Sequence, residues 1–151
     1  MATLGVHCSS PTAFLAAADG DTVRPGPDRI DLRSGLSSED QLPAFVDDVR
    51  RAVRDSAPAR VVVLQAGQYE AGHSAWTNRI AMETLIRLVC VQDGVSCIYV
   101  SRQYVKGAFG LKGKGALDVL GKEELEPVGK YWNAGRMLAA LAAAAAERKA
   151  S

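Results

Sequence analysis

The sequence has few cysteines, few aromatic residues and no excess of charge of either sign. Its three cysteines are odd in number and show no CxxC spacing, which favours reduced thiols in a cytoplasmic protein over a disulfide set or a zinc site. The 18 basic and 17 acidic residues give a net charge of +1. Bulk charge therefore indicates no polyanionic partner.

Long hydrophobic runs are also missing. The apolar run 137-MLAALAAAAA-146 is too short and too rich in alanine to span a bilayer, so we expect no membrane association. No charged head followed by a long apolar core opens the chain, and we expect no signal peptide. The 151 residues, 48% of them hydrophobic, contain no visible linker or repeat, which predicts one domain over residues 1–151.

Several catalytic and nucleotide-binding patterns are absent from the sequence. It contains no GxSxG, no GxGxxG and no GxxxxGK[ST] motif. Cys8 follows His7 directly, but neighbouring residues of a strand point to opposite faces of the sheet. We therefore interpret Cys8 as a buried thiol rather than as a nucleophile with a base. His73 lies in a polar stretch and is expected to face solvent.

The hydrophobic pattern predicts alternating strands and helices. The expected elements are two strands within 2–23, a short strand near 29–33, a helix from Ser37 or Ser38 to before Pro58, a strand at 61–64, a helix at 76–92, a strand at 95–100, a short helix near 116–120 and a final helix at 128–148. This order predicts an α/β fold, in which a mixed sheet of about five strands starts with a β-meander and carries helices on its faces.

Three segments resemble the RNase H-like superfamily, in particular the RuvC-type branch that contains Holliday-junction resolvases. The opening 3-TLGVHCSSPTAFLAAADGD-21 is similar to the first hairpin of that branch, and 60-RVVVLQAGQ-68 is similar to its central strand. The segment 104-YVKGAFGLKGKGALDVL-120 resembles its glycine-spaced basic loop before a short helix. The resemblance implies an RNase H-like fold, a homodimer and a nucleic-acid or protein partner.

Active members of the superfamily hold two divalent metal ions with carboxylates and use them to cleave phosphodiesters. The matching positions here carry His7, Gln65, Asn133 and Arg136, none of which is acidic. Neutral amides cannot repay the dehydration of two hard cations, and an arginine would repel them. The resemblance therefore implies a catalytically degenerate domain without catalytic residues, bound metal or other cofactor.

A basic segment at 101–122 has five bases against Asp118 alone. Glycines in this segment let backbone amides approach phosphate closely, and Tyr104 and Phe109 could stack on bases. It is either an ordinary solvated loop or a contact surface for DNA or RNA. The candidate phosphate contacts are Arg102, Lys106, Lys112 and Lys114.

Two other functions stay open at this point. One is a metal-dependent endonuclease with relocated carboxylate ligands, such as Glu70 or Glu83, which we expect on a polar helix face. The other is a structural subunit of a larger assembly that uses the final apolar helix. The alanines 139–146 permit close helix packing, either inside the chain or across a dimer.

Overall fold

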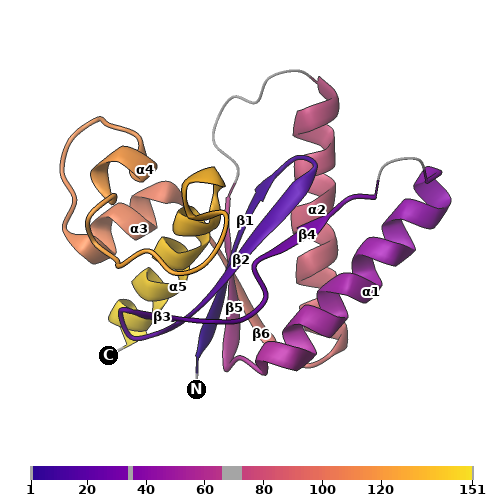
Figure 1. The fold of residues 1–151 in the computed structure, drawn as a ribbon, viewed down its shortest axis with the longest axis horizontal. Helices are drawn as coiled ribbons and strands as arrows, with labels where there is room; N and C mark the ends of the chain where they lie inside the picture. Colours follow the sequence, from indigo (N-terminus) through magenta and orange to yellow (C-terminus); the bar gives the residue numbers. More distant parts are fainter. Residues whose placement is uncertain (1, 34–35, 66–72, 151) are drawn as a thin grey trace.

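The computed structural model describes residues 2–33, 36–65 and 73–150, which form a six-stranded mixed sheet with helices on both faces (Figure 1). The prediction of an α/β mixed sheet is confirmed. None of the helices in the described part of the chain is both long and apolar enough to cross a membrane.

The sheet has the strand order β3-β2-β1-β5-β6, and β4 pairs with the same edge of β2 as β3 does. β1 runs antiparallel to β2 and parallel to β5, and β5 runs parallel to β6. The strands are β1 Thr3–Ser9, β2 Thr12–Asp19, β3 Thr22–Arg24, β4 Arg29–Asp31, β5 Arg60–Leu64 and β6 Ser96–Val100. Only β3 was not predicted, because its three residues directly follow the turn signal 19-DGD-21 and contain one buried apolar residue, Val23.

Helices cover the two faces of the sheet unequally (Figure 1). On one face lie α1 and α2, and on the other lie α3, α4 and α5. Their bounds are α1 Ser38–Ser56, α2 His73–Gln92, α3 Arg102–Phe109, α4 Leu117–Leu120 and α5 Arg136–Ala150, with a 3₁₀ turn at Trp132–Ala134. The sheet therefore separates two hydrophobic cores, and alternate residues of β5 enter one or the other.

α5 lies very close to β1, because both carry small residues at their contact. A Cβ atom built on Gly5 would stand 1.9 Å from the carbonyl oxygen of Ala139, so only glycine fits there. Every residue from Ala139 to Ala146 is fully buried by the rest of the chain. The alanine tract thus packs inside the molecule, which decides between the two roles considered for it.

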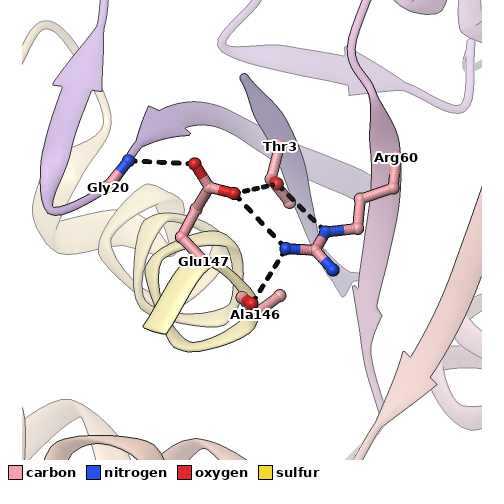
Figure 2. A network of polar contacts seen from close by, with 5 residues as sticks. All are labelled: Thr3, Gly20, Arg60, Ala146 and Glu147. Atoms are coloured by element: carbon pink, nitrogen blue, oxygen red, sulfur yellow. Dashed lines mark hydrogen bonds and ion pairs between the residues drawn. The ribbon is translucent and has the colours of Figure 1, made fainter. Parts of the chain in front are cut away.

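The carboxyl end of α5 is fixed by a polar network around Glu147 (Figure 2). Its carboxylate accepts hydrogen bonds from the Thr3 hydroxyl at 3.0 Å and the Gly20 amide at 2.9 Å, and it pairs with the Arg60 guanidinium at 3.3 Å. Arg60 also donates to the Ala146 carbonyl at 2.9 Å. One carboxylate thereby joins α5 to β1, β5 and the turn between β2 and β3.

Two helix predictions differ from the structure in the last third of the chain. The final helix begins at Arg136 instead of 128, because Gly129, Tyr131 and Gly135 all have positive φ angles and interrupt the helix. The helix α3 was missed, since Gly107 within it and Gly110 at its C-cap suggested a loop. By contrast, α1 begins as predicted, with the Ser37 side chain accepting from the Asp40 amide.

Candidate functional site

The carboxyl ends of the parallel strands β1, β5 and β6 meet at one edge of the sheet, where ligands commonly bind in α/β proteins. His7 of β1 is in register with Leu64, the last residue of β5, and Gln65 follows it. The Gln65 amide donates to the Val100 carbonyl at the end of β6, at 2.8 Å. After Val100 the chain enters α3, so Arg102 lies just beyond the carboxyl end of β6, the third of these strands.

His7 is buried at this edge, with 5% of its surface exposed. Its Nδ1 atom has no hydrogen-bond partner among the residues that the structure describes. Burial, and then the positive charges of Arg79 and Arg102, lower the pKa of His7 to about 3. The imidazole is therefore neutral at pH 7 and cannot supply the negative charge of an aspartate.

A buried ion pair on α2, Arg79 with Glu83, lies close enough to His7 for the charge of Arg79 to act on it. Arg79 and Glu83 are 3% and 1% exposed, and their Nε and Oε2 atoms lie 3.4 Å apart. The Tyr99 hydroxyl donates to the other oxygen of Glu83, and burial followed by this contact raises the pKa of Tyr99 to about 12. The expectation of a polar helix face around Glu83 is wrong, because this residue points into the core.

Sequence reasoning did not single out Arg79, and it considered Glu83 only as a relocated metal ligand, so it foresaw neither the burial nor the pairing of these two residues. They alternate along α2 with Met82 and Ile86, which belong to the buried stripe of the helix. Charged residues at such spacing fall on the apolar face, and buried charges need partners. The burial of Arg79 and Glu83 could therefore have been predicted from their spacing along the helix.

The described residues at this edge do not fit the pair of divalent cations that active members of the superfamily hold. Hard cations need several oxygen ligands, preferably charged ones. Among residues 2–33, 36–65 and 73–150, no three His, Cys, Asp or Glu side chains gather closely enough to hold a metal ion. The groups that act on His7 are guanidiniums instead. Glu70, one of the relocated ligands considered above, lies outside the described residues.

Cys8 points to the face of the sheet opposite His7, as predicted. It belongs to the core beneath α1 and α2, and it is fully buried. Burial, and then the negative charge of Glu83, raise the pKa of this thiol. A nucleophilic pair of Cys8 with His7 is therefore not formed.

Asn133 and Arg136 stand on the 3₁₀ turn and at the start of α5. Asn133 is exposed, whereas Arg136 is 2% exposed. The Arg136 Nε donates to the Leu15 carbonyl at 2.9 Å, and Nη1 donates to the Val128 carbonyl at 2.5 Å. Leu15 lies between the segments of β2 that pair with β3 and with β4, so the guanidinium fills a gap in the edge of the sheet. Arg136 thus serves the packing of the fold.

The four candidate phosphate contacts fall in two different settings. Arg102 and Lys106 lie on α3, which begins with the Ser101 side chain accepting from the Tyr104 amide. Arg102 is half-buried, and Lys106 donates to the Gly115 carbonyl at 2.9 Å, which holds the following loop. Lys112 and Lys114 are exposed on that loop. These two lysines are the best placed of the four to meet a ligand.

The aromatic residues of this segment are covered by cations from α5. The Lys149 Nζ atom lies 4.1 Å from the ring centre of Tyr104, and the Arg148 guanidinium lies 4.2 Å from that of Phe109. Phe109 is also 8% exposed and belongs to the core. Base stacking on these two rings, as considered from the sequence, would require α5 side chains to move away first.

Comparison of the sequence with protein-family models and with curated proteins found no match. Comparison of the structure with solved structures found matches over nearly the whole chain. One is RuvC of Thermus thermophilus in complex with a Holliday-junction substrate, at a TM-score of 0.74 and 13% identity, covering 99% of this chain and 94% of that one. Another is the yeast mitochondrial Holliday-junction resolvase Ydc2, at a TM-score of 0.65 and 12% identity, covering 97% and 77%.

Identities this low speak to the fold alone. The strand order, the helices on both faces and the match along the full chain agree with one another. The chain therefore has the RNase H-like fold in its RuvC-type form.

Proposed function

We propose that this chain is a non-cleaving RuvC-type domain that binds branched nucleic acid. The observation that carries the proposal is the charge at the carboxyl edge of the sheet. Where the resemblance calls for carboxylates, His7 is neutral and lies in the positive field of Arg79 and Arg102. Because Glu83 pairs with Arg79, the described residues at this edge leave no carboxylate cluster for divalent cations, and the half-buried Arg102 is the base there that can attract phosphate.

The choice of ligand rests on the fold. The T. thermophilus RuvC that matches this chain was solved with a Holliday-junction substrate. The exposed lysines Lys112 and Lys114 are placed on a glycine-containing loop, where backbone amides can also approach a phosphate. Contacts of this kind make binding strongly dependent on salt.

A direct test measures binding and cleavage in the same samples. Fluorescence anisotropy with a labelled four-way DNA junction, a duplex and a single strand should show tightest binding to the junction, weakening as salt rises. Added Mg²⁺ or Mn²⁺ should produce no cleavage on a denaturing gel. Metal-dependent cleavage would instead establish the endonuclease with relocated ligands, and absence of salt-sensitive binding to all three nucleic acids would refute the proposal.

The loop lysines provide the first mutational prediction. The double substitution Lys112→Ala with Lys114→Ala should weaken junction binding and lower the slope of log affinity against log salt by about 0.9 for each phosphate that is no longer neutralised. Arg54→Ala on α1, compared with Lys112→Ala alone, is the matched control, because each removes one exposed base and Arg54 is on the other face of the sheet. Equal effects of both changes would argue for nonspecific attraction only.

Pairing of two copies remains a proposal as well, and the described surface suggests where it would occur. Trp76 and Ile80 are each 38% exposed and lie one helical turn apart on α2. A two-fold contact would bring the same patch from both copies together. Light scattering of the full chain should give the mass of a dimer, and Trp76→Ser with Ile80→Ser should give that of a monomer.

We propose the cytoplasm as the location.

A further inference from the structure

Two of the three cysteines lie together where α2 turns into β6. Cys90 is in the last turn of α2, and Cys97 is the second residue of β6. The Val95 amide donates to the Cys90 carbonyl at 2.9 Å, so the chain folds back at once and brings the start of β6 beneath the end of the helix. Both side chains contact the core between the sheet and α2.

The two thiols differ in their access to solvent. Cys90 is fully buried, whereas Cys97 is half-buried and lines an open surface pocket of about 390 Å³. Arg87 lines the same pocket, and its guanidinium lies 4.4 Å from the ring centre of Tyr99. A small polar reagent can therefore reach Cys97 beside a fixed cation, but it cannot reach Cys90 directly.

The surroundings of the two thiols favour Cys97 as the nucleophile and Cys90 as the proton donor. A hydrogen bond with Cys90, aided by the positive charge of Arg87 and opposed by burial, lowers the pKa of Cys97. The same hydrogen bond, with burial, raises the pKa of Cys90. The accessible Cys97 thiol therefore loses its proton more readily than the Cys90 thiol. Thiolates are the reactive form of cysteine.

We propose that Cys97 is a peroxide-reactive thiol and that Cys90 resolves its oxidised form into a disulfide between α2 and β6. In the first step the Cys97 thiolate attacks one oxygen of a hydroperoxide, the O–O bond breaks, and a sulfenic acid and hydroxide (or alkoxide) form. In the second step the Cys90 sulfur attacks the Cys97 sulfur, and the S–O bond breaks. The departing hydroxide takes the Cys90 proton and leaves as water.

This site is separate from the residues of the nucleic-acid proposal, because Cys97 lies near the amino end of β6 and the carboxyl edge follows Val100 at the other end of that strand. It is also far from the proposed contact of two copies. Trp76, where a second copy is proposed to bind, is 15 positions from Val91 of the cysteine pocket, roughly 22 Å along the helix. Cys8 serves as an internal control, because it is fully buried and burial raises its pKa. Its thiol should stay unmodified under conditions that oxidise the other two.

The experiment treats the folded full chain with hydrogen peroxide, alkylates the remaining thiols and maps the unreduced peptides by mass spectrometry. The proposal expects a peptide linking Cys90 to Cys97, with Cys8 alkylated only after unfolding. Cys97→Ser should abolish the link, Cys90→Ser should leave a sulfenic acid on Cys97 that dimedone traps, and Cys8→Ser should behave like the parent chain.

A measurement on the unaltered chain guards against variants that fail to fold. Iodoacetamide applied under native conditions should alkylate Cys97 at least tenfold faster than Cys8. Equal alkylation rates for these two thiols, or a peroxide product linked through Cys8 or only between molecules, would overturn the proposal.

Discussion

At the scale of single residues, the neutral state of His7 makes a prediction about acid stability. The unfolded chain takes up a proton on this imidazole as pH falls below its ordinary pKa of 6.5, whereas the folded chain resists until about 3. Folding stability should therefore be unaffected by His7 above pH 6.5 and fall below it, by about 1.4 kcal/mol for each pH unit. Urea denaturation between pH 7 and 4 measures this.

His7→Gln is the comparison that isolates the effect, because glutamine does not titrate. Its unfolding free energy should decline less steeply with acid than that of the parent chain. The groups whose charge acts on His7 are the guanidiniums of Arg79 and Arg102. Parallel curves for the two proteins would show that His7 keeps an ordinary pKa.

Sequence reasoning reached some of these residues and not others. It placed His7 and Gln65 at neighbouring strand ends, because strand tips follow from hydrophobic runs. It did not foresee that Arg136 would donate to the Leu15 carbonyl, since a gap in the edge of a sheet exists only after the strands have paired. Nor did it bury Glu83, although Arg79 stands one turn before it on α2, because the second partner, Tyr99, comes from β6.

At the scale of elements, the close contact between β1 and α5 predicts a large cost for one methyl group. Gly5→Ala would place that methyl against the Ala139 backbone, so the helix or the strand must shift. We expect a loss of about 3 kcal/mol or more in unfolding free energy, at the upper end of overpacking effects. Thermal and urea unfolding of the purified variant measure it.

Gly26 provides the matched control for this change. A Cβ atom at Gly26 meets nothing within 4 Å, and its φ angle is not positive. Gly26→Ala should therefore be neutral, or slightly stabilising through the unfolded chain. Similar losses from both substitutions would mean that the contact with Ala139 is not what limits residue 5.

Element boundaries were predictable where side chains alone decide them. The start of α1 follows from Ser37 and the acidic residues after it, which satisfy free amides and favour the helix dipole. The start of α5 depends on backbone angles at Gly129 and Tyr131, which pack around Arg136 and Phe14. Such angles express tertiary contacts, and local sequence carries little sign of them.

At the scale of the whole molecule, Glu147 holds together parts of the chain that are far apart in sequence. Burial opposes its ionisation, but hydrogen bonds from Gly20, Thr3 and Arg60 lower the pKa of this carboxyl. Glu147→Gln should lower unfolding free energy by about 1–3 kcal/mol at pH 7, because an amide cannot accept from all three donors. Urea unfolding curves give the value.

The pH dependence of that loss distinguishes charge from shape. A carboxyl with a lowered folded-state pKa contributes stability above its unfolded pKa and loses it as pH falls through the folded value. The difference between Glu147→Gln and the parent chain should therefore shrink in acid. The exposed Glu126 is the control, and Glu126→Gln should change little at any pH. A constant deficit across pH would assign the effect to packing.

The close contact of α5 with β1 has a consequence for how this protein tolerates mutation. Where α5 meets β1, glycine and alanine leave no room, whereas α1 and α2 contact the sheet through larger side chains such as Phe45 and Met82, which can repack. A saturation library scored for soluble expression should therefore show near-intolerance to any gain in volume along Ala139–Ala146, and broad acceptance of hydrophobic exchange on the opposite side. Drift in this lineage would then accumulate on one side of the sheet.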